Sequence, residues 1–253
     1  MTNLTSSNHL WCLLPAAGIG QRMGSSLPKQ YLPLAGQTLL EVTLSRLHLA
    51  FPEAIQVLPL HKEDLWWPAA ELRFSKRYPQ AKIMTCLGGK ERADSVLNGL
   101  NALAQLAKPN DWILVHDLAR PCITQQDLQL LYKTLHDHPV GGLLAAPIAD
   151  TMKRGKREHS SNNNVVSATV DRKQLWHALT PQMFRFNKLH SALSKGLAQG
   201  LSLTDESSAL EAAGYQPLLV PGRRDNIKIT HPEDLPFAEL LLAHQQSTNQ
   251  HTL

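Results

Sequence analysis

The sequence predicts an α/β fold: a Rossmann-like, mostly parallel sheet with helices on both faces. Short apolar runs, typical of buried strands, alternate along the chain with longer segments of helical periodicity. The 253 residues are 43% hydrophobic, which is an ordinary composition for a globular protein and enough for a sizeable core. We therefore expect a single domain over residues 1–244 and a disordered polar tail over 245–253.

Predicted strands and helices alternate up to about residue 148. Apolar runs predict strands at Leu10–Leu14, Ala54–Leu60, Lys82–Leu87, Trp112–His116 and Gly141–Ile148. Helical spacing predicts helices at Thr38–Leu49, at Glu63–Tyr78, from the Gly88-Gly89 turn to about Leu106, and at Thr124–His136. Pro68 lies inside the second helix and is expected to kink or split it. The alternation favours parallel strands joined by crossover helices.

A polar stretch over 150–164 interrupts this alternation. It is rich in Asn and Ser and separates two strand-like segments, Leu143–Thr151 and Val165–Val170. The pattern predicts a long hairpin, a β-arm over about 147–172 that extends from the body. Because a two-stranded arm has too little core of its own, we expect it to pack on a partner subunit.

The last part of the chain is expected to return to helices and short strands. Helices are predicted at Phe184–Leu197, Asp205–Ala213 and Pro232–Ala243, and strands at Leu218–Pro221 and Asn226–Thr230. Asp205 and Glu206 suit the positive N-terminal end of the second of these helices.

Composition and charge pattern disfavour several classes of protein. The formal net charge is only +4 and no dense Lys/Arg run is interleaved with aromatic residues, so nucleic acid is not an expected partner. The apolar run near the N-terminus is too short to span a membrane, and no Lys or Arg precedes Arg22 to form a secretory signal. Three widely spaced cysteines, Cys12, Cys86 and Cys122, lie in or beside apolar runs, which predicts free thiols in a reducing compartment. The predicted location is the cytoplasm.

The stretch from Leu13 to Lys29 carries the strongest functional signal. Pro15 ends the first strand, and a loop of small residues follows: Ala16, Ala17, Gly18, Ile19 and Gly20. Small residues let backbone N–H groups approach a ligand closely, and phosphates bind well to such amides. Arg22 and Lys29 add two cations beside the loop, so the stretch suits a nucleoside triphosphate.

The glycine pattern separates this loop from two common nucleotide-binding motifs. A dinucleotide fingerprint needs a third glycine where the chain has Met23, which disfavours an NAD-dependent oxidoreductase. The P-loop is absent, since Gly88-Gly89-Lys90 is followed by Glu91. A turn whose glycines serve geometry alone remains an alternative, although a pure turn has no use for two adjacent cations.

Three loops are expected to meet at the carboxyl ends of the parallel strands, where open α/β sheets bind ligands. They are residues 15–29, 88–95 and 117–120, and they carry the cations Arg22, Lys29, Arg92 and Arg120 with the carboxylates Asp94 and Asp117. This set suits a polyphosphate with a divalent metal. Simpler interpretations stay open: Arg92 can pair with Asp94 or Glu91, and Asp117 can cap a turn. His116 is assigned no role.

These motifs resemble a known family. Pro15–Met23 and Pro28–Tyr31 resemble the signature of nucleotidyltransferases that join a nucleoside monophosphate to a sugar or polyol phosphate. From about residue 10 to 243 the chain is most similar to the 2-C-methyl-D-erythritol 4-phosphate cytidylyltransferases, and the segments 150–153, 169–172 and 178–182 are specific to that family. The resemblance implies that the substrate phosphate attacks the α-phosphate of CTP in line, giving 4-CDP-2-C-methyl-D-erythritol and pyrophosphate. It also implies Mg²⁺ or another divalent cation, and a homodimer formed through the β-arm.

The resemblance also assigns residues to roles. The catalytic cations are Arg22, Lys29 and Lys228. Contacts to CTP fall on Pro15, Ala16, Ala17, Gly18, Gly20, Gly89, Ser95 and Ala119. Contacts to the polyol phosphate fall on Asp117, Arg120, Thr151, Arg172 and Thr180, with Thr151 and Arg172 reaching a neighbouring subunit. The candidate metal ligands are Asp117 and Asp225.

Two departures and two rival functions stay open. Leu118 stands where the family often has a small residue, so it either crowds the ribose side or points into the core, and Lys90 takes a variable position beside the base site. A ribitol-phosphate cytidylyltransferase, or another sugar-phosphate nucleotidyltransferase, would share the same nucleotide loop. A nucleotide-binding protein without turnover is a further rival, disfavoured by the joint presence of Lys29, Asp117 and Lys228.

Overall fold

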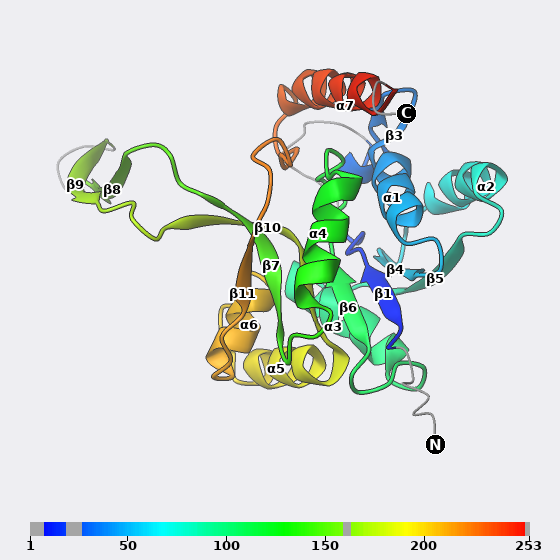
Figure 1. The fold of residues 1–253 in the computed structure, drawn as a ribbon, viewed down its shortest axis with the longest axis horizontal. Helices are drawn as coiled ribbons and strands as arrows, with labels where there is room; N and C mark the ends of the chain where they lie inside the picture. Colours follow the sequence, from blue (N-terminus) through cyan, green and yellow to red (C-terminus); the bar gives the residue numbers. More distant parts are fainter. Residues whose placement is uncertain (1–7, 19–26, 159–162, 251–253) are drawn as a thin grey trace.

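The computed structural model describes residues 8–18, 27–158 and 163–250, and a seven-stranded sheet lies at the centre of these segments (Figure 1). The strand order is β11-β7-β10-β6-β1-β4-β5, and all neighbours are parallel except where β10 pairs with β6 and β7. The strands are β1 (Leu10–Leu13), β4 (Ile55–Leu60), β5 (Lys82–Leu87), β6 (Trp112–Val115), β7 (Gly141–Pro147), β10 (Trp176–Arg185) and β11 (Leu218–Pro221). The predicted mostly parallel α/β sheet is confirmed.

Helices cover both faces of the sheet, as predicted. The helices that pack there are α1 (Leu39–Ala50), α2 (Trp67–Arg77), α3 (Arg92–Leu103), α4 (Gln125–Leu135), α5 (Phe186–Ala198) and α6 (Glu206–Ala212). Side chains alternate along each strand: Cys12 and Leu114 join the core with α1, α2 and α4, whereas Leu13 and Ile113 join the core with α3, α5 and α6. A third apolar cluster joins α7 (Asp234–Gln250) to α1 and to the small β2–β3 hairpin (Pro33–Leu34 and Gln37–Thr38).

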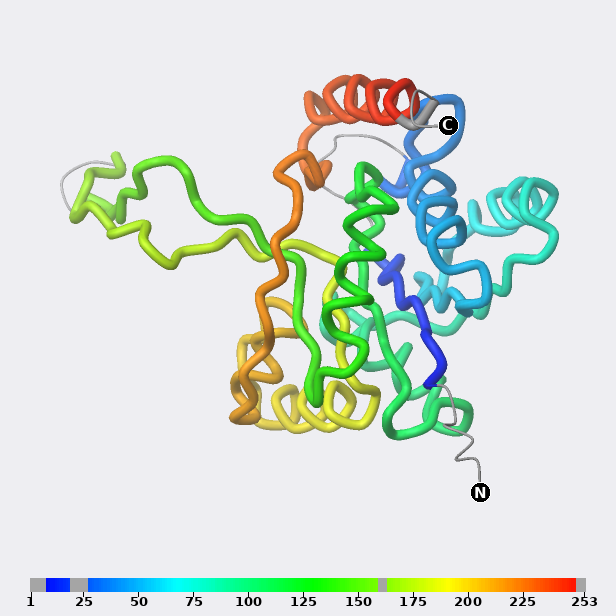
Figure 2. Tube along the Cα trace, viewed as in Figure 1, coloured from blue at the N-terminus to red at the C-terminus, as the bar shows by residue number. Residues whose placement is uncertain are grey.

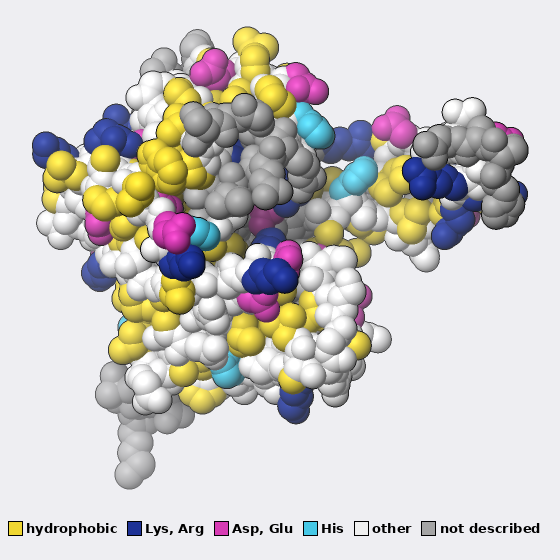
Figure 3. Space-filling model, turned by 180° about the vertical axis from the view of Figure 1, so that it is seen from behind, with side chains coloured by type: hydrophobic (Ala, Val, Ile, Leu, Met, Phe, Trp, Pro, Cys, Tyr) yellow, Lys and Arg dark blue, Asp and Glu magenta, His cyan; other side chains and the backbone are white. Residues whose placement is uncertain are grey.

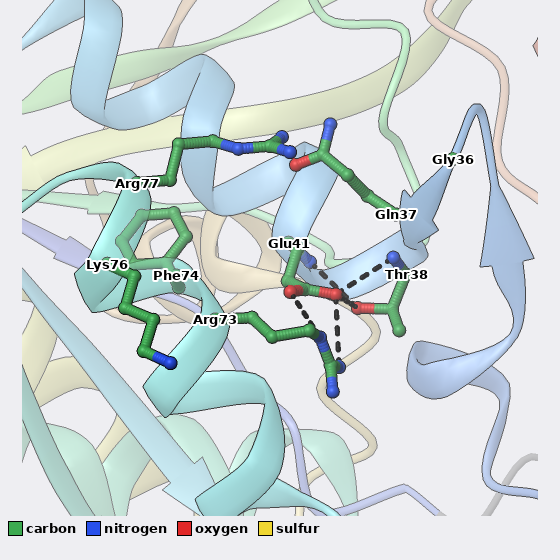
Figure 4. Close-up of a pocket in the computed structure, with 8 residues that line it drawn as sticks. All are labelled: Gly36, Gln37, Thr38, Glu41, Arg73, Phe74, Lys76 and Arg77. Atoms are coloured by element: carbon green, nitrogen blue, oxygen red, sulfur yellow. Dashed lines mark hydrogen bonds and ion pairs between the residues drawn. The ribbon is translucent and has the colours of Figure 1, made fainter.

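The start of α1 is fixed by its own cap and by α2. Thr38 and Glu41 form a capping box, and Arg73 of α2 donates from Nε and Nη2 to the Glu41 carboxylate at 2.9 and 3.2 Å (Figure 4). The cleft beside this pair has a volume of about 550 Å³, and none of the predicted site residues line it. Helix α2 begins at Trp67 rather than Glu63, so Pro68 lies in its first turn, where a missing N–H costs nothing, and does not kink it.

Strand β10 was missed by the sequence analysis. A helix was predicted from Phe184, but β10 runs to Arg185 and α5 begins at Phe186. The strand signal is weak because Pro181 interrupts the segment and the pairing with β7 shifts register between Ala178 and Gln182. The strand matters for function because it lies beside β6 and carries Thr180 and Gln182 next to the site.

The predicted β-arm is present as a separate two-stranded sheet, β8 (Met152–Arg157) with β9 (Asn164–Val170). Figures 1 and 2 show it projecting away from the body, and Figure 3 shows Lys and Arg side chains gathered on it. Most of its residues are exposed, and Val166 keeps 63% of its surface open. An isolated hairpin of this kind has little core to stabilise it.

The C-terminal part differs from the prediction in two places. Residues 226–230 form an irregular segment instead of a strand, and Ile229 N–H donates to the carbonyl of Ala119 at 2.8 Å. Helix α7 continues to Gln250, so the prediction of a disordered tail from residue 245 is wrong for residues 245–250. Residues 251–253 lie outside the described part. Gln245 is buried and donates to the carbonyl of Cys122 at 2.9 Å, which anchors the helix. Among the described helices, none combines the length and apolarity needed to cross a membrane.

Candidate functional site

A cavity of about 150 Å³ lies at the carboxyl ends of β1 and β6, where the sequence predicted that loops would converge. It is lined by residues of four segments that are far apart in the sequence. They are Pro15, Ala16, Gly18, Lys29, Gln30, Leu39, Arg92, Asp117, Leu118, Ala119 and Lys228. Two of the three predicted catalytic cations thus share one cavity with the small-residue loop. The third, Arg22, lies outside the described residues, as does Gly20.

The described start of the small-residue loop is fixed by hydrogen bonds at Ala16. Ala16 N–H donates to the carbonyl of Pro59 at 2.9 Å, and the buried Gln30 side chain donates to the Ala16 carbonyl at 2.9 Å. Among the described residues, no atom lies within 4 Å of the position that a β-carbon on Gly18 would take. A side chain on Gly88 would collide with Ala17, so glycine is needed where the first and second loops touch.

The second loop is shaped by Ser95 at the start of α3. Gly89 N–H donates to the Ser95 hydroxyl at 3.0 Å, and a side chain on Gly89 would collide with Asp94. Ser95 is buried and Lys90 is exposed. Both Gly89 and Ser95 therefore lie in a tight turn beside the first loop, and their contacts to a cytosine base remain predictions.

An ionic chain runs along one wall of the cavity. Lys228 Nζ lies 2.8 Å from Asp117 Oδ2, and Arg92 Nε donates to Asp117 Oδ1 at 2.8 Å. Arg92 also donates from Nη1 and Nη2 to Glu206 at 2.6 and 3.1 Å. The alternative in which Arg92 pairs with Asp94 or Glu91 is not what the structure has: its guanidinium turns toward the sheet and binds two carboxylates from other elements.

The charges of this chain keep Asp117 ionised. Burial alone would raise the pKa of the Asp117 carboxyl, but the Arg92 and Lys228 charges outweigh burial and hold that pKa well below its ordinary value. Burial alone would lower the pKa of Arg92, yet Glu206 and Asp117 raise it above the ordinary arginine value. Burial raises the pKa of Glu206 above its ordinary value, although the Arg92 charge opposes that shift. Among the described residues the cluster thus joins Arg92 and Lys228 to the ionised Asp117 and the buried Glu206, with Lys228 as its half-exposed member at 44% side-chain exposure.

Thr180 and His116 fix the backbone of Asp117. The Thr180 hydroxyl accepts the Asp117 N–H at 3.1 Å and lies 3.0 Å from His116 Nδ1. His116 Nε2 faces the Arg120 carbonyl at 3.1 Å, so we assign the ring hydrogen to Nε2 and the Thr180 proton to the Nδ1 contact. Burial lowers the pKa of His116 to about 4, which keeps the ring neutral near pH 7. Thr180 is itself buried and serves this network, and its predicted contact to substrate remains a prediction.

The segment carrying Lys228 is tied to two other parts of the site. Lys29 Nζ donates to the carbonyl of Ile229 at 2.9 Å, and Arg120 Nη1 donates to the carbonyl of Asn226 at 2.7 Å. Asn226 in turn donates from its side chain to the Thr180 carbonyl at 2.8 Å. These hydrogen bonds fix the segment 226–230, which has irregular backbone where the sequence predicted a strand.

Ala17, Gly89, Ser95, Arg120 and Thr180, whose contacts are given above, do not line the cavity, and neither do three further predicted site residues. Thr151 and Arg172 are exposed at the root of the β-arm, next to β8 and β9. Asp225 pairs with Arg223, whose Nε donates to Asp225 Oδ1 at 2.9 Å. Within the described segments, no group of three or more His, Cys, Asp or Glu side chains is placed to hold a metal ion. Asp117 and Asp225, the two predicted metal ligands, take part in different ion pairs in this structure, and their roles as metal ligands remain predictions.

Leu118, which departs from the residue type common in the family, lies between the core and the cavity. Its side chain is buried in the core with α1 and α4 and also lines the cavity, and its carbonyl accepts the Thr43 hydroxyl at 2.8 Å. Leu118 therefore belongs mainly to the core. Ala119 beside it is buried, and its carbonyl accepts the Ile229 N–H.

Glu206 is the member of the site that the sequence analysis did not identify. It was assigned only to the N-terminal end of a helix, yet its side chain is 1% exposed and binds Arg92. A glutamate directly after an N-cap aspartate is ordinary, so local sequence offers no signal for a partner 114 residues away.

A small-residue loop, two lysines and an ionised aspartate meet at the carboxyl edge of a mostly parallel sheet, which is the arrangement expected of a nucleotide-binding transferase. The chain matches the family model described as "IspD: 2-C-methyl-D-erythritol 4-phosphate cytidylyltransferase" over residues 10–244. It therefore belongs to the 2-C-methyl-D-erythritol 4-phosphate cytidylyltransferase family, and the resemblance predicted from its motifs is confirmed.

Individual relatives agree with this assignment. The 2-C-methyl-D-erythritol 4-phosphate cytidylyltransferase of Chromohalobacter salexigens is 50% identical over 246 residues, covering 97% of this chain and 94% of that one. The enzyme of the same name from Hahella chejuensis is 48% identical over 92% of both chains. A crystal structure of a 4-diphosphocytidyl-2C-methyl-D-erythritol synthase superposes with a TM-score of 0.76 at 36% identity, covering 93% of this chain and 98% of that one.

Proposed function

We propose that this chain transfers the cytidylyl group of CTP to 2-C-methyl-D-erythritol 4-phosphate and releases pyrophosphate. The observation that carries the proposal is the convergence of Lys29, Lys228 and the ionised Asp117 on the small-residue loop. The family membership over residues 10–244 supports the choice of nucleotide and polyol.

The reaction needs cations more than bases. A phosphate oxygen of the polyol substrate forms a bond to the α-phosphorus of CTP, and the bond from that phosphorus to the bridging oxygen of the leaving pyrophosphate breaks. The attacking oxygen is already ionised at neutral pH, so no strong general base is required. Lys29 and Lys228, with Arg22 from the same predicted set, stabilise charge that builds on the α-phosphate and on pyrophosphate.

Asp117 serves this chemistry in two ways: it holds Lys228, and we assign it a contact to the polyol phosphate. Its carboxylate orients the Lys228 ammonium at 2.8 Å, which keeps that cation at the cavity. We assign the polyol phosphate to the side of the cavity toward Arg120, which is tied to the Asn226 carbonyl at 2.7 Å. CTP is assigned to the loop of Pro15 to Gly18 and to the turn that Gly89 and Ser95 form.

Magnesium enters this proposal as part of the substrate. The described residues offer Asp117 without the further acidic ligands that a protein-built site needs. Mg²⁺ in proteins is commonly held by substrate phosphates with one or two carboxylates. We therefore propose that CTP binds as its Mg²⁺ complex.

The β-arm supports a homodimer in the proposed working state. Thr151 and Arg172 flank a hairpin that projects from the body with most of its residues exposed (Figure 2). We propose that the arm packs on a second copy and brings Thr151 and Arg172 to the polyol site of that copy. The three cysteines are free, which supports a reducing compartment, and we propose the cytoplasm.

Phosphorus NMR of a reaction mixture tests the proposal directly. Protein, CTP, Mg²⁺ and the methylerythritol phosphate should together give the two coupled resonances of a new diphosphodiester and the single resonance of pyrophosphate. The same mixture with UTP or ATP in place of CTP serves as the control for the base. Release of inorganic phosphate without the diphosphodiester would contradict a transfer reaction.

A further inference from the structure

Glu206 is a buried carboxylate whose partner lies in another helix. It opens α6, its side chain is 1% exposed, and it accepts from Arg92 at 2.6 and 3.1 Å. A bidentate arginine–carboxylate pair has a fixed planar geometry. Glu206 therefore sets the orientation of the Arg92 guanidinium as well as its position.

All three nitrogens of that guanidinium are used inside the protein. Nη1 and Nη2 bind Glu206, and Nε binds Asp117 Oδ1 at 2.8 Å. Arg92 lines the cavity but is committed to two carboxylates, so it acts as a link between them. Rotation of the guanidinium would displace the Asp117 contact, because the three donors lie in one rigid plane.

The chain of contacts from Arg92 through Asp117 ends at Lys228, which lines the cavity. Asp117 Oδ2 holds Lys228 Nζ at 2.8 Å, and the Asp117 backbone is fixed separately by Thr180. Hydrogen bonds with Arg120 and Ala119 fix the backbone on either side of Lys228. The Lys228 side chain is 44% exposed, and its ammonium is held at the cavity by the Asp117 carboxylate.

Helix α6 has anchors besides Glu206. Asp205 is its N-cap and accepts the Ser208 N–H at 2.9 Å. Gln182 of β10 donates to Asp205 Oδ2 at 2.9 Å and accepts the Ser207 N–H at 2.8 Å. The start of the helix is thus capped and tied to the sheet by other groups, which leaves the Glu206 side chain for a separate purpose.

We propose that Glu206 is a positioning residue for nucleotidyl transfer: through Arg92 it orients the Asp117 carboxylate and so holds Lys228 in place for the reacting phosphates. The inference rests on the proposed function, since it assigns Lys228 to the reacting phosphates. It adds a residue from α6 that touches no substrate in this account.

Kinetics of Glu206→Gln test the proposal against a purely structural role. The glutamine keeps the side-chain shape but replaces one of the two oxygens that accept from Arg92 with an amide nitrogen, which cannot accept. We expect kcat to fall on the order of 10- to 100-fold, because small displacements of a positioned group have effects of this size. The KM for CTP is expected to change less than about threefold, the pattern of an interaction made only in the transition state. Glu211→Gln is the control, since Glu211 is exposed on the same helix.

A double-mutant cycle shows whether Glu206 acts through Lys228. In a Lys228→Ala background, Glu206→Gln is expected to lower kcat by less than about threefold, because the group that it positions is gone. The proposal is overturned if Glu206→Gln lowers kcat by the same factor in the Lys228→Ala background as in wild type. A wild-type kcat in the Glu206→Gln single variant would also overturn it. If Glu206→Gln does not fold, Glu206→Asp keeps the charge but withdraws it from Arg92, and wild-type kcat in that variant would overturn the proposal.

Turnover by the wild-type chain distinguishes a failure of this proposal from a failure of the proposed function. Turnover of CTP with the methylerythritol phosphate by wild type, with Glu206→Gln equal to it, would remove the positioning role alone. A folded wild type without turnover on any polyol phosphate would overturn both.

Discussion

Lys228 Nζ lies 2.8 Å from Oδ2 of Asp117, which joins the irregular segment before α7 to the carboxyl end of β6. Two charges from distant parts of the chain are held together at the edge of a small cavity. Arg92 approaches the other oxygen of the same carboxylate, also at 2.8 Å. Asp117 is therefore the centre of the site's charge arrangement.

Asp117→Asn should lower both activity and stability. The variant leaves two cations beside a neutral amide, and removing one partner of a buried ion pair typically costs about 3–5 kcal/mol in the free energy of unfolding. Urea denaturation of both proteins at pH 7 measures this cost. Asp137→Asn is the matched control, because the Asp137 side chain is 88% exposed.

The stability difference between wild type and Asp117→Asn should depend on pH. The folded protein holds the pKa of Asp117 below its ordinary value of 3.8, so the ionised carboxylate stabilises the fold fully above that value. The difference should shrink as the pH falls below about 4, because the unfolded chain then binds the proton first. A difference that grows on acidification would contradict the assigned ion pairs.

Lys29→Ala should lose most turnover while keeping the fold. The lysine lines the cavity and donates to the Ile229 carbonyl at 2.9 Å, close to the segment that carries Lys228. Loss of one group that stabilises transition-state charge typically lowers kcat by about 10²–10³. Circular dichroism and steady-state kinetics measure fold and rate. Lys76→Ala, an exposed lysine in the cleft of Figure 4, should keep wild-type kcat.

Removal of divalent metal should abolish turnover without changing thermal stability. We proposed that the metal enters with the nucleotide as a Mg²⁺ complex, so we expect its removal to affect the reaction and not the fold. Turnover and melting temperature are both measured with EDTA and again after excess Mg²⁺ is added. A melting temperature that falls with EDTA and recovers with Mg²⁺ would point instead to a metal bound by the protein.

Mixing two inactive variants tests whether the arm serves a neighbouring subunit. Lys29→Ala lacks a cation of its own cavity, and Arg172→Ala lacks a residue at the root of the arm. If Arg172 completes the site of a partner, each mixed dimer contains one complete site, and random exchange restores about a quarter of wild-type activity. If Arg172 serves its own chain, the mixture stays inactive.

The fold was predictable where periodicity was clear. The strands β5 and β11 have the predicted bounds, and α1 begins one residue after its capping threonine, because short apolar runs and caps are local signals. Strand β10 was missed because its pairing partners are distant and Pro181 breaks the alternation. Helix α7 was predicted too short because the burial of Gln245 is set by α1 and by Cys122, which local sequence does not show.

The site was predictable to the extent that its residues follow strands. The loops after β1 and β6 were expected to meet, and they do. The partners of Arg92 were not predictable, since Asp117 and Glu206 approach it only when α3, β6 and α6 have packed on one another. Glu206 had no local signal at all, because its role depends on burial.

Release of pyrophosphate from CTP reports nucleotidyl transfer by this protein. Wild-type protein with Mg²⁺ is given 2-C-methyl-D-erythritol 4-phosphate in one tube and ribitol 5-phosphate in another. We expect release with the methylerythritol compound alone. Release with ribitol 5-phosphate alone would contradict the assigned acceptor and the roles given to Thr151, Arg172 and Thr180, and no release with either compound, from folded protein that binds CTP, would contradict transfer itself.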